Sequence, residues 1–408
     1  MKKSLVFRLG VVLLLILPVA VWSAPKATFF WAGYDGLTED FRALVESSFN
    51  KQSSDAQIQI VPVPWDVLQD KLNTAVAGGA PPDISVVGTR WILDYMATDS
   101  VVEVTPYLSK ATLSNINPAA MEAKVKGKLM GIPVAAGARI LAINNDIAKD
   151  VPKTMEELEA DAIKANDPPD HFGLFMPGKA HIELTDFCYY FYAAGGNYFA
   201  TKADGSYGKC TVNSPAGVKA LTFMAKLALE DKVVEDNFTT YQRITGHPLF
   251  YAGKIGYVMI GAWVDSAMKQ AGAKFPVTYA NIPSFAGQKP AGLIITDSIA
   301  FFTKAKNLKA AGKFVDYFYQ DKYKGKFDQL IGFPPVTLSA AKDPFWQTPL
   351  YQALNKAALT ALPWPLVDGF DTLNTEVWNA CEKVFQGQAT PREALDAAAE
   401  AVDTARGM

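Results

Sequence analysis

Residues 127–146, GKLMGIPVAAGARILAINND, form the stretch around which the rest of the chain is organised. An apolar run from Leu129 to Val134 predicts a buried strand, and Pro133, which has no N–H to donate, suits a strand edge or a point where the chain leaves a sheet. The small residues 135–138 let the backbone bend or lie close to another segment. A second apolar run, 140–143, ends in an Asn-Asn-Asp turn. The pattern predicts a passage between two lobes, with a connection inside one sheet as the alternative.

The length of 408 residues predicts roughly two domains. Half of the residues are apolar and 12% are aromatic, which is enough for large cores. A formal net charge of −2 and a pI near 6.0 argue against a nucleic-acid partner, which would require a basic face. Aromatic rings could stack on an apolar ligand face, but most of them are expected in the core.

The N-terminus, residues 1–24, has the pattern of a signal peptide. Two lysines and an arginine within residues 2–8 precede an apolar run over residues 9–21, and the small residues Ser23 and Ala24 follow. The run is short for a membrane span of ~20 residues. We therefore expect cleavage near Ser23 and Ala24 and export to the periplasm, with an uncleaved membrane anchor as the alternative.

Three cysteines and three histidines give little sign of a metal or cofactor. Cys188, Cys210 and Cys381 are an odd number, so at least one thiol stays free in an oxidising compartment. A Cys188–Cys210 disulfide and buried free thiols are both compatible with the sequence. There is no CxxC motif and no histidine cluster, and we predict neither a metal nor a cofactor.

Strand and helix patterns alternate in the first part of the chain. Strands are predicted at 28–31, 58–63 and 83–87, with helices at 37–50 and 66–77 between them. This order implies a parallel sheet with helices on both faces. Because ligands bind beyond the carboxyl ends of such strands, residues 31–35 and 88–91 are expected at one edge of a cleft.

The later chain continues the alternation. Thr154 is predicted to cap a helix, with Glu157 completing a capping box. A strand is predicted at 255–260, a helix from Val264, and a strand over 293–302 that crosses back between lobes. Further helices are predicted at 186–194, 215–230 and 308–319, and the chain beyond residue 335 is expected to be mostly helical. Residues 249–254 are expected to lead into the strand at 255–260.

The order of several short motifs resembles the periplasmic solute-binding proteins of ATP-driven importers, in particular the carbohydrate-binding group that includes maltodextrin-binding protein. The motifs are GGAPPDI at 78–84, GKLMGIP at 127–133, TMEEL at 154–158, GG at 195–196, FYAGK at 250–254, GAW at 261–263 and GQATPREAL at 387–395. Each motif is weak alone, but together they span nearly the whole mature chain.

This resemblance implies a type II binding-protein fold, with two α/β lobes and a ligand enclosed between them. The implied lobes are 25–134 plus 298–338 and 135–297 plus 339–408, joined by crossovers near 133–137, 294–299 and 336–342. Members of the family pass a sugar to the permease of an ABC transporter without altering it. A monomer that binds a sugar and contacts a permease is therefore expected.

The resemblance also implies ligand contacts at strand ends. Trp263 matches a tryptophan that stacks on a pyranose ring, although a tryptophan more often fills a core. Asp265 could accept hydrogen bonds from sugar hydroxyls or cap the following helix. Tyr34 and Asp35 match a ligand-contacting position, whereas Trp31 could instead face the core.

Two arginines raise the question of a charged ligand. Thr89, Arg90 and Trp91 follow the third strand, where the family places polar contacts, and Arg90 is favoured among them because its donor fork suits vicinal hydroxyls or an acidic group. A salt bridge is the alternative for Arg90, and Arg139 could likewise pair within its lobe. If both reach the cleft, a sugar bearing phosphate, sulfonate or carboxylate becomes a second, less favoured hypothesis.

The remaining candidates are scattered. Gly137 stands where maltodextrin-binding members of the family have an acidic ligand contact. This difference weakens the case that maltodextrin itself is the ligand. His181 lies in a loop expected to reach the ligand, together with its neighbours at 179 and 183. Phe333 and Trp364 could line the cleft, although Trp364 could instead pack between the last helices.

Two other functions are open at this point. A secreted glycosidase would need two carboxylates ~5–10 Å apart in a cleft, but no nucleophile elbow, metal motif or triad signature is present. A binder of a polyol, glycerol phosphate or an opine would keep the fold and change the ligand.

Overall fold

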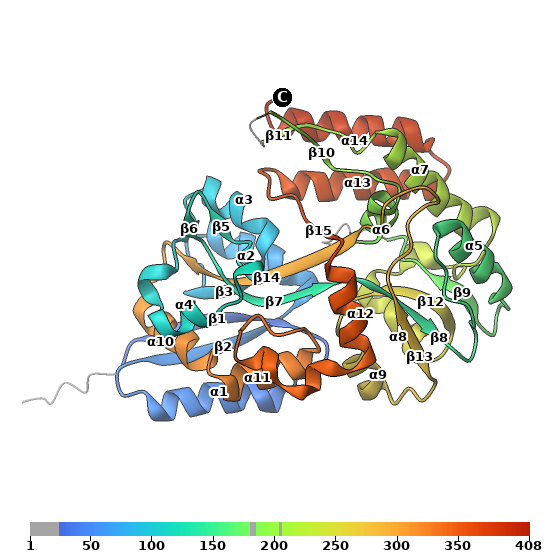
Figure 1. Ribbon diagram of the computed structural model, residues 1–408. Coiled ribbons are helices and arrows are strands. Elements are labelled where there is room, and N and C mark those ends of the chain that lie inside the picture. The colour runs from blue at the N-terminus through green and yellow to red at the C-terminus, as the bar shows by residue number, and fades with distance from the viewer. Residues whose placement is uncertain (1–23, 180–184, 204–205) are drawn as a thin grey trace, which may run out of the picture.

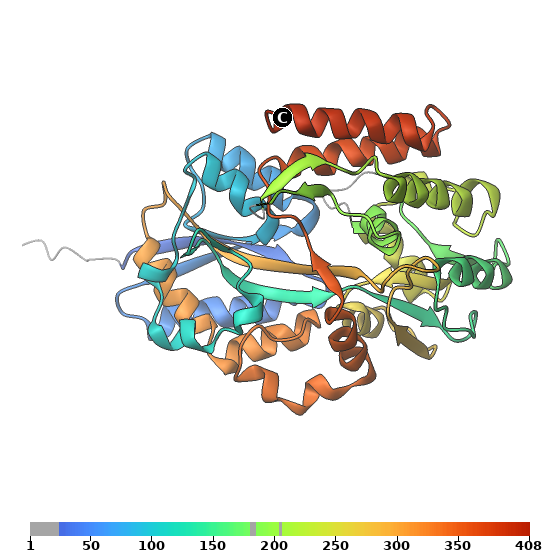
Figure 2. The ribbon, with the colours of Figure 1, turned by 45° about the horizontal axis from the view of Figure 1, so that its top comes forward.

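Two β-sheets, one in each lobe, form the frame of the protein (Figure 1). The computed structural model describes residues 24–179, 185–203 and 206–408. Both lobes are α/β, and two long strands run across the middle of the molecule from one lobe to the other (Figures 1 and 2). The architecture is the two-lobed type II binding-protein fold predicted from the sequence.

The large sheet has seven strands in the order β15-β14-β3-β1-β2, with β4 and β7 also paired to β14. β1 is parallel to β2 and to β3, which confirms the predicted parallel arrangement, whereas β14 is antiparallel to β3. The strands are β1 (Lys26–Gly33), β2 (Gln57–Pro64), β3 (Ile84–Gly88), β4 (Val101–Val102), β7 (Ile132–Ala138), β14 (Gly292–Phe302) and β15 (Ala361–Pro363).

The small sheet has the order β13-β8-β12-β9. Every residue of β8 and β12 is buried, as expected for strands covered on both faces. Its strands are β8 (Ile140–Asn144), β9 (Phe172–Phe175), β12 (Ile255–Ile260) and β13 (Val277–Ala280). Two short hairpins lie outside the sheets: β5 (Lys124–Val125) with β6 (Lys128–Leu129), and β10 (Phe199–Thr201) with β11 (Tyr207–Cys210).

The stretch quoted first connects the two sheets. β7 pairs antiparallel with β14 in the large sheet, and after a single residue, Arg139, the chain enters β8 of the small sheet. Pro133 lies in β7, where the Tyr319 hydroxyl donates a hydrogen bond of 2.7 Å to its carbonyl oxygen. The register of the β7–β14 pair shifts between Asp297 and Ser298. The predicted passage between lobes is therefore correct, and the connection within one sheet is excluded.

Helices cover both sheets. Beside the large sheet lie α1 (Glu39–Gln52), α2 (Trp65–Ala77), α3 (Ile92–Ala97), α4 (Lys110–Asn115), α10 (Leu308–Phe318) and α11 (Asp321–Ile331). On the other side lie α5 (Met155–Lys164), α6 (Thr185–Ala193), α7 (Pro215–Ala225, continued by a π turn at Lys226–Glu230), α8 (Arg243–Tyr251) and α9 (Val264–Ala271). The chain ends in α12 (Pro349–Ala358), α13 (Phe370–Phe385) and α14 (Pro391–Ala405).

Local sequence explains most of these helices. α1 begins at Thr38, whose hydroxyl accepts the Phe41 N–H, and it buries Phe41, Val45 and Phe49 at a spacing of four residues. α5 begins as predicted, because the Thr154 hydroxyl accepts the Glu157 N–H at 3.1 Å. The Glu157 carboxylate accepts the Lys153 N–H, one residue earlier than a reciprocal capping box would require.

The C-terminal segment touches both lobes. β15 pairs with β14 in the large sheet, while α13 and α14 pack on each other and on α7. The exact division of the chain between the lobes remains a prediction. Cys188, Cys210 and Cys381 are buried free thiols, so the Cys188–Cys210 disulfide does not form. Within the described residues, no helix is both long and apolar enough to span a membrane.

Candidate functional site

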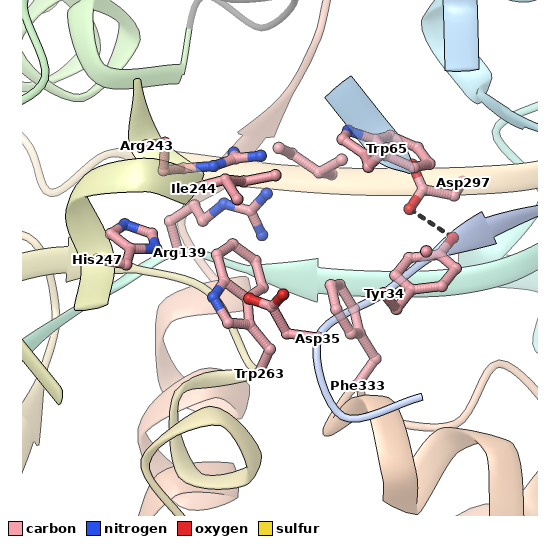
Figure 3. Close-up of a pocket in the computed structure, with 12 residues that line it drawn as sticks. Tyr34, Asp35, Trp65, Arg139, Arg243, Ile244, His247, Trp263, Asp297 and Phe333 are labelled. Atoms are coloured by element: carbon pink, nitrogen blue, oxygen red, sulfur yellow. Dashed lines mark hydrogen bonds between the residues drawn. The ribbon is translucent and has the colours of Figure 1, made fainter. Parts of the chain in front are cut away.

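A cavity of about 50 Å³ lies where the ends of both sheets meet (Figure 3). Since one water molecule needs ~10–15 Å³ by this measure, the walls stand close together in this arrangement. The lining residues are Gly33, Tyr34, Asp35, Trp65, Arg139, Arg243, Ile244, His247, Trp263, Ile295, Asp297 and Phe333.

We call the first side the large-sheet wall, defined by Tyr34, Asp35, Trp65 and Asp297. Tyr34 and Asp35 follow the carboxyl end of β1, and Trp65 follows the carboxyl end of the adjacent parallel strand β2. This is the edge at which parallel sheets bind ligands. The strand order therefore explains why side chains from two separate segments reach the same space.

Asp297 is fixed from two directions on this wall. The Tyr34 hydroxyl donates a hydrogen bond of 3.0 Å to one carboxylate oxygen of Asp297. The other oxygen lies 3.9 Å from a guanidinium nitrogen of Arg90. Burial raises the pKa of Tyr34 well above its ordinary value, and Asp297 adds to the rise, so the phenol stays protonated and can donate. The arrangement presents an oriented carboxylate to the cavity.

Asp35 is the second carboxylate of the large-sheet wall. Although residue 35 is exposed to solvent, partial desolvation of its carboxyl beside the cavity raises the pKa of Asp35, while the positive charge of Arg243 on the opposite wall lowers it. The two walls are therefore electrostatically coupled through this pair. An acceptor such as Asp35 suits a hydroxyl donor on a ligand.

The opposite side is the small-sheet wall, defined by Arg139, Arg243, His247 and Trp263. Trp263 follows β12, and Arg139 lies directly before β8. The Trp263 ring is stacked with Phe333, with ring centres 5.9 Å apart. The guanidinium carbons of Arg139 and Arg243 lie 4.7 and 5.4 Å from the centre of the Trp263 ring. These distances are those of cation–π contacts.

Helix α8 supplies Arg243, Ile244 and His247 to this wall. The sequence did not predict this helix, because Gly246 and Pro248 interrupt its pattern and both residues usually disfavour a helix interior. Buried Phe250 and packing against β9 and β12 hold it in place. One sequence signal was available: Thr245, three residues after Gln242, accepts the Gln242 N–H as in a capping box.

The predicted site residues fall into three groups. Tyr34, Asp35, Arg139, Trp263 and Phe333 line the cavity. His181 lies outside the described residues. The others, described next, lie elsewhere or one layer behind the cavity.

Thr89, Arg90 and Trp91 support the large-sheet wall from behind. Arg90 is 1% exposed, packs against the rings of Trp91 and Phe370, and faces Asp297. Trp91 stacks on Trp65 with ring centres 5.6 Å apart. Thr89 and Ser298 are hydrogen-bonded through their hydroxyls at 2.8 Å. In this arrangement these three residues act on the cavity through their neighbours.

Gly137, Asp265 and Trp364 have other surroundings. A Cβ at Gly137 would lie 3.1 Å from the Phe333 ring, so the glycine lets that ring approach β7. The Asp265 carboxylate accepts a hydrogen bond from the Tyr279 hydroxyl. Trp364 packs against Tyr198 and Phe370. Of the three, Gly137 adjoins the cavity, through Phe333.

Trp65, Arg243, His247 and Asp297 line the cavity but were not predicted to do so. Trp65 follows β2 and could have been found by applying the strand-end rule to all three parallel strands. Asp297 interrupts an apolar strand, and a charged residue in such a run is itself a signal. In the described residues, no group of three or more His, Cys, Asp or Glu side chains could hold a metal ion.

The fold and the cavity between its lobes define a type II binding protein. The chain belongs to the bacterial extracellular solute-binding protein family, whose family model matches residues 34–325. Its relatives and its fold are those of substrate-binding proteins rather than enzymes.

Individual relatives agree with this assignment. A binding protein of Brucella abortus is 27% identical over 383 residues, which cover 91% of each chain. The sn-glycerol-3-phosphate-binding periplasmic protein of Pectobacterium atrosepticum is 24% identical and covers 91% of this chain and 89% of its own. An ABC-transporter solute-binding protein of Thermotoga lettingae, solved with α-D-tagatose, superposes with a TM-score of 0.85 at 21% identity, covering 94% of this chain and all of that one.

Proposed function

We propose that the protein is the substrate-binding component of an ABC importer and captures a carbohydrate or a similar polyol between its lobes. The observation that carries this proposal is the cavity in which Trp263 faces Tyr34 and Asp35 from the other sheet. The C–H faces of a sugar suit an indole surface, while its hydroxyls need polar partners. Both kinds of group line the same cavity. The sugar and glycerol-phosphate ligands named for related proteins support this class of ligand.

Closure of the lobes would be a hinge motion in the paired strands β7 and β14, which join the two sheets. The stacked rings of Phe333 and Trp263 provide a contact that would part on opening, because Phe333 follows α11 beside the large sheet and Trp263 follows β12. Closing over a ligand would expel water and change the surface offered to a permease.

The other parts of the proposal follow from the family. The chain would be exported to the periplasm after cleavage near Ser23 and Ala24, act as a monomer, and release its ligand unaltered to the membrane permease. The implied lobes remain 25–134 plus 298–338 and 135–297 plus 339–408. The formal net charge of −2 gives no reason to expect a nucleic-acid partner.

A ligand screen tests the proposal. The mature chain, starting near residue 25, is melted with a panel of sugars, polyols, their phosphates and their acids, and each hit is titrated by calorimetry. We expect one compound to raise the melting temperature, to bind with one-to-one stoichiometry, and to be recovered chemically unchanged after the protein is denatured. A cleaved or modified compound would support a secreted hydrolase instead, and binding confined to non-carbohydrate solutes would contradict the proposed ligand class.

A further inference from the structure

The two walls of the cavity carry opposite charges. The small-sheet wall consists of two arginines, one histidine and one tryptophan, whereas the large-sheet wall bears the carboxylates of Asp35 and Asp297. Figure 3 shows the guanidinium groups of Arg139 and Arg243 pointing from their own wall into the space in front of Trp263. A ligand between these walls therefore has a positively charged wall on one side and a negatively charged wall on the other.

The two arginines reach this position from separate parts of the chain. Arg139 is the residue between β7 and β8, and Arg243 is the first residue of α8. They are 3% and 7% exposed, respectively, and stack on the same indole. Convergence of two buried guanidinium groups on one aromatic platform is expected where a site is built for an anion, because the planar donor forks match the oxygens of a phosphate, sulfonate or carboxylate.

The carboxylates on the far wall are arranged differently. Asp297 is oriented by the Tyr34 hydroxyl and by Arg90, which lies behind the wall. Its charge is therefore partly balanced within its own wall, and it can accept hydrogen bonds from neutral hydroxyls. Asp35 offers a second acceptor elsewhere in the cavity, where its carboxylate interacts electrostatically with Arg243.

Resting on the proposed function, we propose that the ligand is a polyhydroxylated anion. Its phosphate, sulfonate or carboxylate group would bind Arg139 and Arg243, and its hydroxyl groups would face Asp35 and Asp297.

Matched pairs of neutral and anionic compounds test this inference. The mature protein is titrated by calorimetry with glucose, glucuronate and glucose 6-phosphate, and with glycerol and glycerol 3-phosphate. We expect one anionic member to bind at least about 100-fold more tightly than its neutral counterpart, which corresponds to two charge-assisted contacts. The identity of that member separates a carboxylate from a phosphate.

Substitutions of the two arginines test where the anionic group of the ligand binds. Arg139→Gln and Arg243→Gln should each weaken binding of the anionic member roughly 10- to 100-fold and weaken binding of the neutral counterpart clearly less, so that the preference for the anion shrinks. Arg406→Gln is the matched control, because Arg406 also stacks on a ring, at 4.3 Å from the centre of Phe199, and donates to a carbonyl oxygen away from the cavity. If a Gln variant fails to fold, Arg243→Lys keeps the charge but loses the fork and should give a smaller loss.

The outcomes separate the inference from the proposed function. If the neutral sugar or polyol binds as tightly as its anionic partner, the inference is wrong and the proposed function stands. If neither kind binds at any concentration tested, the result counts against both. Equal losses in the Arg406 variant would also overturn the inference, because the effect would then not come from the cavity.

Discussion

The two walls of the cavity both include residues at strand ends but have opposite chemistry. Tyr34 and Asp35 follow β1 on one side, and Trp263 follows β12 on the other, where helix α8 adds Arg243 and His247. The large-sheet wall presents acceptors that are oriented by groups behind it, and the small-sheet wall presents donors stacked on an indole. The shared architecture fixes where a ligand lies, and the side chains decide which way round it binds.

Two buried arginines illustrate the difference between supporting a wall and facing the cavity. Arg90 and Arg243 are both buried beside aromatic rings, yet Arg90 lies behind the large-sheet wall and Arg243 faces the cavity. Removing Arg90 should therefore reduce stability, whereas removing Arg243 should mainly reduce affinity. Four substitutions test this distinction, and they follow from the largest expected effect to the smallest.

The largest effect is expected from Arg90→Met. The substitution keeps a long apolar stem but removes the guanidinium group that lies 3.9 Å from the buried Asp297 carboxylate, so we expect the free energy of unfolding to fall by about 3–5 kcal/mol. Urea denaturation monitored by circular dichroism measures the loss. Unchanged stability combined with abolished ligand binding would place Arg90 in the site itself and remove the distinction between the two arginines.

Trp263→Ala comes next. Loss of the indole removes the stacking surface for the ligand and the platform for Arg139 and Arg243, so binding should weaken by ~1–3 kcal/mol. Titration calorimetry well below the melting temperature measures the change, and Trp263→Phe should lose less because a smaller ring remains. Wild-type affinity in the Ala variant would exclude Trp263 from the site.

Tyr34→Phe sharpens the description of the large-sheet wall. It deletes the hydroxyl that donates to Asp297 and retains the ring, so ligand affinity should fall by about 0.5–1.5 kcal/mol. The loss should be of similar size for neutral and anionic ligands, because the small-sheet wall is untouched. A selective loss of anionic ligands would show that the two walls do not act separately.

The smallest effect concerns the pH dependence set by Asp35. Because partial desolvation raises its pKa in the folded protein, the unfolded chain releases this proton first, and Asp35 makes stability fall as pH rises from about 4 toward its folded pKa. Asp35→Asn should remove this slope, and the change should be small because residue 35 is exposed to solvent. Arg243→Gln should steepen it, since Arg243 lowers the pKa. Denaturation curves between about pH 4 and 7 measure both; a slope unaltered by Asp35→Asn would contradict the assignment.

Much of this site was predictable, and the omissions have physical causes. The alternation of strands and helices predicted a parallel sheet, and its strand-end rule located Tyr34 and Asp35 at the cavity. The family motif that ends at Trp263 predicted one residue of the small-sheet wall. Local patterns of this kind are set by short-range chemistry, which a sequence displays directly.

The rest depends on tertiary packing. Helix α8 contains Gly246 and Pro248 and is stabilised by contacts with β9 and β12, so its residues Arg243 and His247 could not be placed from local propensity. Arg90 follows a strand end just as Tyr34 does, but its side chain turns back beneath the wall toward Asp297. Which way a long side chain turns after a strand is decided by partners distant in sequence.

A crystal structure of the mature protein with the compound identified by the ligand screen would show whether the ligand is held between the two walls. We expect the compound to lie intact between them, with a ring or carbon face against Trp263 and hydroxyl groups toward Asp35 and Asp297. A compound bound on the outside of either lobe, with the space between Trp263 and Tyr34 unchanged, would contradict it.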